Sequence, residues 1–388
     1  MQKSFGLLTV LLASTLTVSA DSQWQKLGYS EGKGAVDHRS MGKAARGTIY
    51  SCQFTALGGS LNRPWVGEEG TIYFLKKPFV KGNKKWNSNI KYDESNPNIA
   101  VTGNGLPNHV TGDFPIKSGT TAYQYDRNPN SISSQNISYA IPTNPEIASK
   151  PSCLPMGTIG IALSGGVFFN ALDADKRDAV ANEIFDACEG HPQQQGQYHY
   201  HHNSPCFEQG NAGEHSPQLG YAFDGFGIYG ARGDNGQIIS NKELDECHGH
   251  IGSAIDRFGD QIDEYHYHIN NEFPYTLGCF KGVVDQSMLE RRPSPQGDMR
   301  GDTRVGNRGE NQQGGELRNG PPAGGGNMRG GAGGGRPDLS VVAKKLGISE
   351  QALMRALGPP PPNFSNAAKK LGISRRKLQD AMRAAGAP

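Results

Sequence analysis

The tetrapeptide Tyr-His-Tyr-His occurs twice in this chain of 388 residues, at 198–201 and at 265–268. A Cys-x-Gly-His element precedes each copy, beginning at Cys188 and at Cys247. Two copies of one long pattern in a single chain indicate a duplicated structural unit. We therefore predict two similar folding units that pack about a pseudo-twofold axis.

The duplication extends upstream of these motifs. Residues 159–165 read Ile-Gly-Ile-Ala-Leu-Ser-Gly, and residues 219–225 read Leu-Gly-Tyr-Ala-Phe-Asp-Gly, with an offset of 60. The offset between the two Cys-x-Gly-His elements agrees with this value within one residue. The predicted repeats are therefore residues 157–217 and 218–285.

The patterns between the motifs favour strands over helices. Residues 21 to about 156 carry short apolar runs separated by Gly, Asn, Pro, Ser and Thr, which is typical of short strands joined by turns. Asp-Gly within residues 222–226 predicts a hairpin turn. Apolar spacing within residues 173–187 predicts one short helix. We predict a mainly β (α+β) fold, with an N-terminal β-rich region at 21–97 and a second domain at 98–285.

Residues 1–20 have the pattern of a secretory signal peptide. Lys3 precedes an apolar stretch from Phe5 to Ala13, and Val-Ser-Ala ends at Ala20 as a small-residue cleavage site. No later apolar run approaches the ~20 residues of a membrane-spanning helix. We expect an extracytoplasmic protein, periplasmic or secreted, without a transmembrane segment in the mature chain.

The chain has six cysteines, which in an exported protein predicts three disulfides. Six cysteines allow fifteen pairings, and only the symmetry of the repeats selects among them. An alternative stays open, in which Cys188, His191 and Cys206 bind zinc. The repeats predict the pairs Cys188 with Cys206 and Cys247 with Cys279, which leaves Cys52 with Cys153.

Two further segments follow the duplicated unit. Residues 286–337 are rich in glycine and poor in apolar residues, so they cannot offset their ordering entropy and are predicted to be a disordered linker. Residues 338–388 contain Ala-Lys-Lys-Leu-Gly-Ile-Ser twice, 25 residues apart. Because glycine ends helices and serine begins them, this pattern predicts two small helical hairpins.

The charge is distributed unevenly along the chain. Residues 1–289 carry 22 basic and 29 acidic residues, whereas residues 290–388 carry 17 basic and 8 acidic residues. The basic tail is suited to contact with an anionic cell envelope or another protein, or it serves only to keep the protein soluble. Its Leu-Gly-Ile-Ser turn is similar to that of a helix-turn-helix, but export argues against a nucleic-acid partner.

Nine of the eleven histidines fall between residues 191 and 268. If each tetrapeptide is a strand, alternation places its two histidines on one face and its two tyrosines on the other. Imidazoles two residues apart on a strand can converge on one ion, and imidazole suits zinc, copper, iron or nickel. The predicted metal ligands are His199, His201, His266 and His268, assisted by His191 and His250.

Several alternatives to this metal-site prediction stay open. The imidazoles can form one closed site or two neighbouring open ones. His202 is a weaker candidate because Ile269 stands at its place in the second repeat, and His215 is weaker because it lies in a polar loop. The tyrosines are expected to pack into the core, with support of the ligands as the alternative. A strand with a histidine-lined surface that binds nothing is the competing structural interpretation.

With these residues in view, the chain resembles the family named for the YHYH motif, a group of mostly exported proteins without an established activity. The resemblance covers about residues 98–284. Its motifs include Asn-Gly-Leu-Pro-Asn-His, which ends at His109, and the turn that contains Asp224. The resemblance adds His109 as a site residue and draws attention to Asp224, which the first repeat replaces with Ser164.

Three functional hypotheses follow. The first is an exported metal-binding protein that holds copper or zinc. The second is a metal-dependent hydrolase or oxidoreductase, in which His109 or Asp224 is the acid or base. The third is a disulfide-stabilised adhesion or glycan-binding module. No nucleophile elbow, phosphate loop or dinucleotide fingerprint is present in the sequence.

Overall fold

The computed structural model describes residues 30–35, 42–59, 61–93, 98–289, 338–358, 362, 364–373 and 375–385. The predicted signal peptide and residues 290–337, which make up most of the predicted linker, lie outside the described residues. Within the described ranges, no helix has the length and apolar character needed to cross a membrane.

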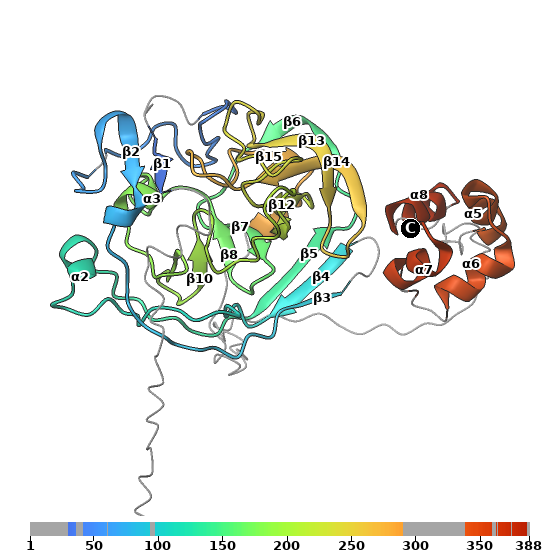
Figure 1. The fold of residues 1–388 in the computed structure, drawn as a ribbon, viewed down its shortest axis with the longest axis horizontal. Helices are drawn as coiled ribbons and strands as arrows, with labels where there is room; N and C mark the ends of the chain where they lie inside the picture. Colours follow the sequence, from blue (N-terminus) through green and yellow to red (C-terminus); the bar gives the residue numbers. More distant parts are fainter. Residues whose placement is uncertain are drawn as a thin grey trace, which may run out of the picture.

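An eight-stranded sheet holds both repeats (Figure 1). Its strand order is β13-β14-β12-β11-β7-β8-β10-β9, so the first repeat forms one half of the sheet and the second repeat forms the other. The strands of the first repeat are β7 (Thr158–Ala162), β8 (Val167–Phe169), β9 (Gly190–Pro192) and β10 (Tyr198–Tyr200). Those of the second are β11 (Gln218–Ala222), β12 (Gly227–Tyr229), β13 (Gly249–Ile255) and β14 (Gln261–His268).

The two halves meet at the antiparallel pair of β7 and β11. Ile161 pairs with Tyr221, and Tyr221 is the residue equivalent to Ile161 in the second repeat, at the offset of 60 residues. The remaining contacts repeat on both sides: β10 lies parallel to β8 and antiparallel to β9, as β14 lies parallel to β12 and antiparallel to β13. The pseudo-twofold axis predicted from the sequence therefore passes between Ile161 and Tyr221.

Close approach of β7 and β11 explains a repeated glycine. A Cβ atom on Gly160 would lie 2.6 Å from the carbonyl oxygen of Tyr221, and one on Gly220 would lie 2.2 Å from that of Ile161. Both distances are too short for any side chain. The register also shifts at the residue before each glycine, which gives each repeat an equivalent irregularity. The duplicated Ile/Leu-Gly sequence is thus a requirement of the central strand pair.

Shorter sheets and single-turn helices surround this sheet. The strands β3, β4 and β5 form a three-stranded antiparallel sheet, while β1 pairs with β2 and β6 pairs with β15. Their bounds are β1 (Glu31–Lys33), β2 (Thr71–Tyr73), β3 (Lys91–Asp93), β4 (Asn98–Gly103), β5 (Ile137–Pro142), β6 (Ile147–Ser152) and β15 (Phe280–Gly282). The short helices are η1 (Glu68–Gly70), η2 (Phe74–Lys76), α2 (Thr121–Tyr125), α3 (Ala179–Asn182) and α4 (Gln286–Leu289). The prediction of a mainly β fold is confirmed.

The helix predicted within residues 173–187 is much shorter than expected. Only α3 is helical, because side chains on both sides of it bond to the backbone instead. Asp173 accepts from the amides of Asp175 and Arg177, and Asp186 accepts from the amide of Cys188. The Asp-Gly turn of the second repeat forms as predicted, with Gly225 at a φ of 94°.

The three disulfides have the connectivity that the repeats predict. Cys188 pairs with Cys206 and Cys247 pairs with Cys279, with sequence separations of 18 and 32. Cys52 pairs with Cys153. Because all six sulfurs are paired, Cys188 and Cys206 are not thiolate ligands, and the zinc site proposed for them with His191 is wrong. The disulfides are consistent with an extracytoplasmic, oxidising compartment.

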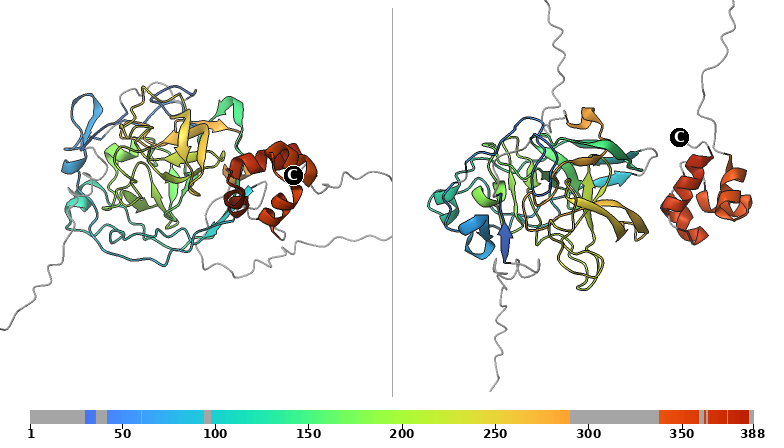
Figure 2. Two further views of the ribbon diagram at one scale, coloured as in Figure 1. Left: turned by 45° about the vertical axis from the view of Figure 1, so that its right-hand side comes forward. Right: turned by 90° about the horizontal axis from the view of Figure 1, so that it is seen from above.

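The C-terminal repeats form four helices (Figure 2). These helices share a cluster of buried apolar side chains that is separate from the main core. The helices are α5 (Leu339–Leu346), α6 (Glu350–Leu357), α7 (Phe364–Leu371) and α8 (Arg375–Ala384). Gly347 ends α5 in the left-handed conformation and Ser349 caps α6, as predicted. The two predicted hairpins share one cluster of buried side chains, which includes Val342, Leu353, Ala367 and Leu378.

Candidate metal centres

The first group of imidazoles comes from the hairpin of β9 and β10. His191 lies directly opposite His199 in this strand pair, and His201 follows the last residue of β10. All three side chains are buried. Their ring nitrogens converge, and Nε2 of His199 lies 3.1 Å from Nε2 of His201. We call these residues the first imidazole group.

One carboxylate reaches the first imidazole group. Oε2 of Glu183 lies 3.6 Å from Nε2 of His191 and 3.6 Å from Nε2 of His201. This oxygen is shielded from solvent and has no hydrogen-bond partner among the described residues. Burial raises the pKa of Glu183 well above its ordinary value, and the nearby Asp173 and Asp126 raise it further.

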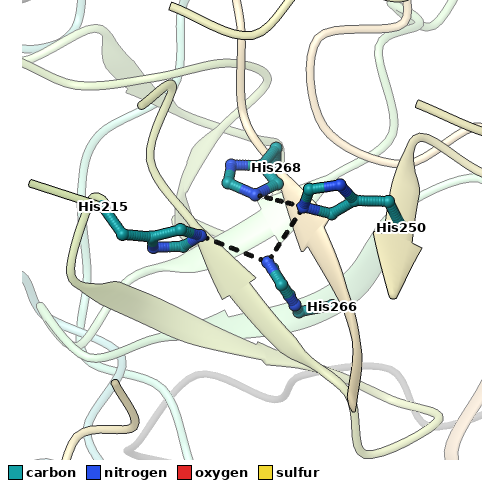
Figure 3. Close-up of side chains that lie close together, drawn as sticks. All are labelled: His215, His250, His266 and His268. Carbon is teal, nitrogen blue, oxygen red and sulfur yellow. Dashed lines mark hydrogen bonds between the residues drawn. The ribbon is translucent and has the colours of Figure 1, made fainter. Parts of the chain in front are cut away.

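The second group of imidazoles comes from the hairpin of β13 and β14 (Figure 3). His250 lies opposite His266, as His191 lies opposite His199, and His268 ends β14. His215 joins them from the segment before β11. Nε2 of His266 lies 3.2 Å from Nε2 of His215 and 3.2 Å from Nε2 of His250. Nε2 of His250 also lies 3.2 Å from Nε2 of His268. We call these four residues the second imidazole group.

Backbone carbonyls fix the tautomers of five of these rings. A carbonyl oxygen only accepts, so the Nδ1 atom facing it carries the proton, and in the neutral ring Nε2 is left with a lone pair. Metal-binding histidines characteristically make this second hydrogen bond. The Nδ1 atoms donate from His199 to Gln197, from His201 to Asn170, from His215 to Ser216, from His266 to Glu264 and from His268 to Gly230, at 2.5 to 3.2 Å.

Burial keeps these rings neutral. It lowers the pKa of His201 to about 3 and that of His266 to about 2, where the neighbouring His250 and His215 add to the effect. A hydrogen bond between two Nε2 atoms would need one ring to be protonated on both nitrogens, which burial disfavours. The converging lone pairs are therefore arranged for a cation.

The spacing of the nitrogens matches tetrahedral coordination. Imidazole nitrogens at ~2.0 to 2.1 Å from a tetrahedral zinc lie roughly 3.3 Å from one another. The contacts of 3.1 and 3.2 Å in the two groups are close to this value. Because all the ligand atoms of each group lie within 4.8 Å of one another, each group can hold a metal ion.

The two groups lie in opposite halves of the sheet. Four strands separate β10 from β14, which corresponds to about 24 Å along the sheet at the usual strand spacing. The six predicted imidazoles thus form two sets of three, one set in each repeat. The four tetrapeptide histidines do not come together in one site. The repeats pair through β7 and β11, so the tetrapeptides do not meet.

The tetrapeptide tyrosines lie on the other face and are buried in the core. Tyr198 and Tyr265 donate to Asp186 and Asp245, the aspartates two residues before the first cysteine of each repeat. Tyr267 donates to Asp224, whereas Tyr200 bonds with Ser164. These hydroxyl groups hold the histidine-bearing strands to the preceding turns.

His109 and Asp224 lie on the tyrosine side and join neither imidazole group. Nδ1 of His109 donates to the carbonyl of Val110, and its Nε2 accepts from Tyr200 at 2.5 Å. Asp224 is fully buried and accepts from Tyr267 and from the amide of Gly282 at 2.8 Å. Both residues form hydrogen bonds that connect separate segments of the fold. Their predicted catalytic role stays a prediction.

Sequence reasoning gave little weight to His215 and did not consider Glu183. Pro155 stands at the position equivalent to His215, so the repeat offers no signal for this residue. Lys242 and Glu243 occupy the place equivalent to Glu183, and both are exposed. His202 bonds to Glu189 at 3.0 Å and also lies outside both groups.

Comparison with known proteins supports the family resemblance. Residues 138–237 match the family model described as YHYH protein, a span that begins in β5 and ends after β12. This match confirms the resemblance over the first repeat and the start of the second. Neither the curated proteins nor the solved structures gave a match.

Proposed function

We propose that this chain is an exported metal-binding protein with two metal sites, one in each repeat. The observation that supports it is the convergence of Nε2 lone pairs in both groups, with Nδ1 held by backbone carbonyls. Neutral imidazoles in a tetrahedral arrangement suit copper or zinc. Handling of these metals outside the cytoplasm is the corresponding role.

The second imidazole group favours binding over catalysis. It offers four protein donors, and structural metal sites are closed in this way, whereas catalytic sites keep an open position. The three disulfides support a periplasmic or secreted location. The basic tail, residues 290–388, is proposed to contact the anionic envelope or a protein partner, with no role for nucleic acid.

Elemental analysis of the mature chain, produced without a histidine tag and reloaded with zinc or copper, tests this proposal. We expect two ions per chain. The pair His199→Ala and His201→Ala should lose one ion, and the pair His266→Ala and His268→Ala should lose the other. His109→Ala, on the opposite face, should retain both. Binding of fewer than two ions by the reloaded parent would overturn the proposal.

A further inference from the structure

The two imidazole groups differ in their fourth donor. In the second group it is the neutral ring of His215, which lies 3.2 Å from His266. In the first group, the carboxylate of Glu183 lies 3.6 Å from Nε2 of His191 and 3.6 Å from Nε2 of His201. The equivalent Glu243 of the second repeat is exposed and bonds to Ser240 at 2.5 Å instead. The pseudo-symmetry of the repeats is therefore broken at the metal ligands.

Glu183 is held in place by the N-terminal region. It follows α3, whose last carbonyl groups accept hydrogen bonds from three side chains of that region. Trp65 donates to the carbonyl of Ala181 at 2.9 Å, and Lys77 and Arg63 donate to those of Val180 and Asn182 at 2.7 Å. The backbone before Glu183 is thus fixed independently of the imidazoles.

The charges of Lys77 and Arg177 attract the Glu183 carboxylate, but neither forms an ion pair with it among the described residues. Arg177, the nearest basic residue in sequence, pairs with Asp173 and Asp175 at 2.7 Å. The ammonium group of Lys77 lies over the ring of Phe185, 4.1 Å from its centroid. A shielded carboxylate oxygen without a hydrogen bond is costly unless a cation lies beside it. Oε2 of Glu183 faces Nε2 of His191 and the Nε2 lone pair of His201 at the place where such a cation would bind.

We infer that Glu183 is the fourth ligand of the first site, which makes this a divalent-metal site of three imidazoles and one carboxylate, chemically distinct from the four-imidazole second site. This inference rests on the proposed function, because it assumes that both groups bind metal. The second site, by contrast, has four neutral imidazole ligands, and such a site also accepts monovalent copper. The chain then carries two sites with different metal preferences.

The physical reason is the charge of the ligand. A carboxylate attracts a divalent ion about twice as strongly as a monovalent ion at the same distance, whereas a neutral imidazole provides no such net charge. Carboxylate oxygen is also a harder ligand than imidazole nitrogen and suits copper(I) less well. The first site should therefore prefer zinc(II) over copper(I) more strongly than the second site does.

The test measures zinc(II) and copper(I) affinities of the mature chain by competition with chromophoric chelators, with ascorbate as the reductant for copper. His266→Ala and His268→Ala are present throughout, so that only the first site is observed. We expect Glu183→Gln to weaken zinc binding by ~100-fold or more, since even residues that support a ligand give 10- to 100-fold losses. Copper(I) binding should weaken by less than about 10-fold on the same scale.

Glu243→Gln is the matched control, because Glu243 occupies the equivalent segment and is exposed. It should leave both affinities unchanged. Equal zinc affinity of Glu183→Gln and its parent would overturn the inference while leaving the proposed function intact. Failure of the unmodified chain to bind two ions would instead defeat the proposed function.

A second measurement covers the case in which Glu183→Gln does not fold. The structure of the zinc-loaded, unmodified protein should show Oε2 of Glu183 at ~2.0 to 2.2 Å from the ion in the first site. A carboxylate oxygen more than ~3 Å from a zinc ion bound by His191, His199 and His201 would overturn the assignment.

Discussion

The hydroxyl group of Tyr198 donates hydrogen bonds to both carboxylate oxygens of Asp186, at 2.9 and 3.0 Å. Asp186 also accepts from the amides of Gly112 and Cys188, at 2.9 and 2.8 Å, and is fully buried. This one carboxylate therefore joins the first tyrosine of the tetrapeptide to the turn that carries the disulfide.

Removal of the Tyr198 hydroxyl group should cost more than the same change in the second repeat. Tyr198→Phe leaves a buried carboxylate short of a donor, which we expect to lower the free energy of unfolding by about 1 to 3 kcal/mol. Tyr265→Phe should cost less than about 1 kcal/mol, because Asp245 is 24% exposed and also pairs with Lys281. Urea denaturation of both variants measures the difference, and equal costs would contradict this account.

The disulfides should contribute in the order of the loops they close. The separations are 101 residues for Cys52 and Cys153, and 18 for Cys188 and Cys206. Loop-closure entropy predicts that replacing the first pair with serine costs about 4.7 kcal/mol and the second about 3 kcal/mol. Thermal and urea unfolding of the two double variants test this order. A larger loss of stability on removal of the shorter loop's disulfide would contradict the prediction.

Asp224 should make the stability of the metal-free protein depend on pH. Burial raises its pKa to about 6, whereas the unfolded value is about 3.9. A carboxyl group whose pKa is raised by folding stabilises the protein below the unfolded pKa, and this contribution is lost as the pH rises through the folded pKa. Relative to Asp224→Asn, the parent should lose about 2 kcal/mol between pH 4 and pH 7.

Urea unfolding of both proteins at the two pH values, with a chelator present, measures this difference for Asp224. Other titrating groups occur in both proteins and cancel in the comparison. Parallel pH profiles of parent and variant would show that Asp224 does not titrate as described.

Metal removal should lower the stability of the folded protein. A free zinc concentration of 100 times the dissociation constant stabilises the folded state by about 2.7 kcal/mol at each site. His215→Ala removes one donor of the second imidazole group. The stabilisation by that site should then be lost, which is about half of the total stabilisation by zinc at the same zinc concentration. Thermal unfolding with zinc and with a chelator measures the effect, and His109→Ala should behave like the parent. A full zinc response in His215→Ala would exclude that ring as a ligand.

The sequence predicted those features that depend on repetition and alternation. The disulfide pairs followed from the repeat, and the tetrapeptide strands place His199 and Tyr198 on opposite faces because successive side chains alternate. The hairpin at Asp224 and Gly225 followed from a local conformational preference, the positive φ of glycine.

The remaining features depend on long-range contacts. The separation of the two imidazole groups follows from the pairing of β7 with β11, and neither strand carries a histidine that would signal it. His215 and Glu183 reach their groups from irregular segments, where no periodicity indicates which way a side chain points. Their roles could only be recognised once the distances between their nitrogens and oxygens were known.

The self-pairing of Ile161 with Tyr221 has a consequence for how this molecule can change. The two repeats meet through equivalent strands, as the subunits of a twofold dimer do, so the chain is arranged like a dimer whose halves are joined covalently. In a true homodimer, every substitution would appear in both halves. Only within one chain can a carboxylate at Glu183 and an imidazole at His215 be acquired separately, so tandem fusion is what permits the two halves to specialise.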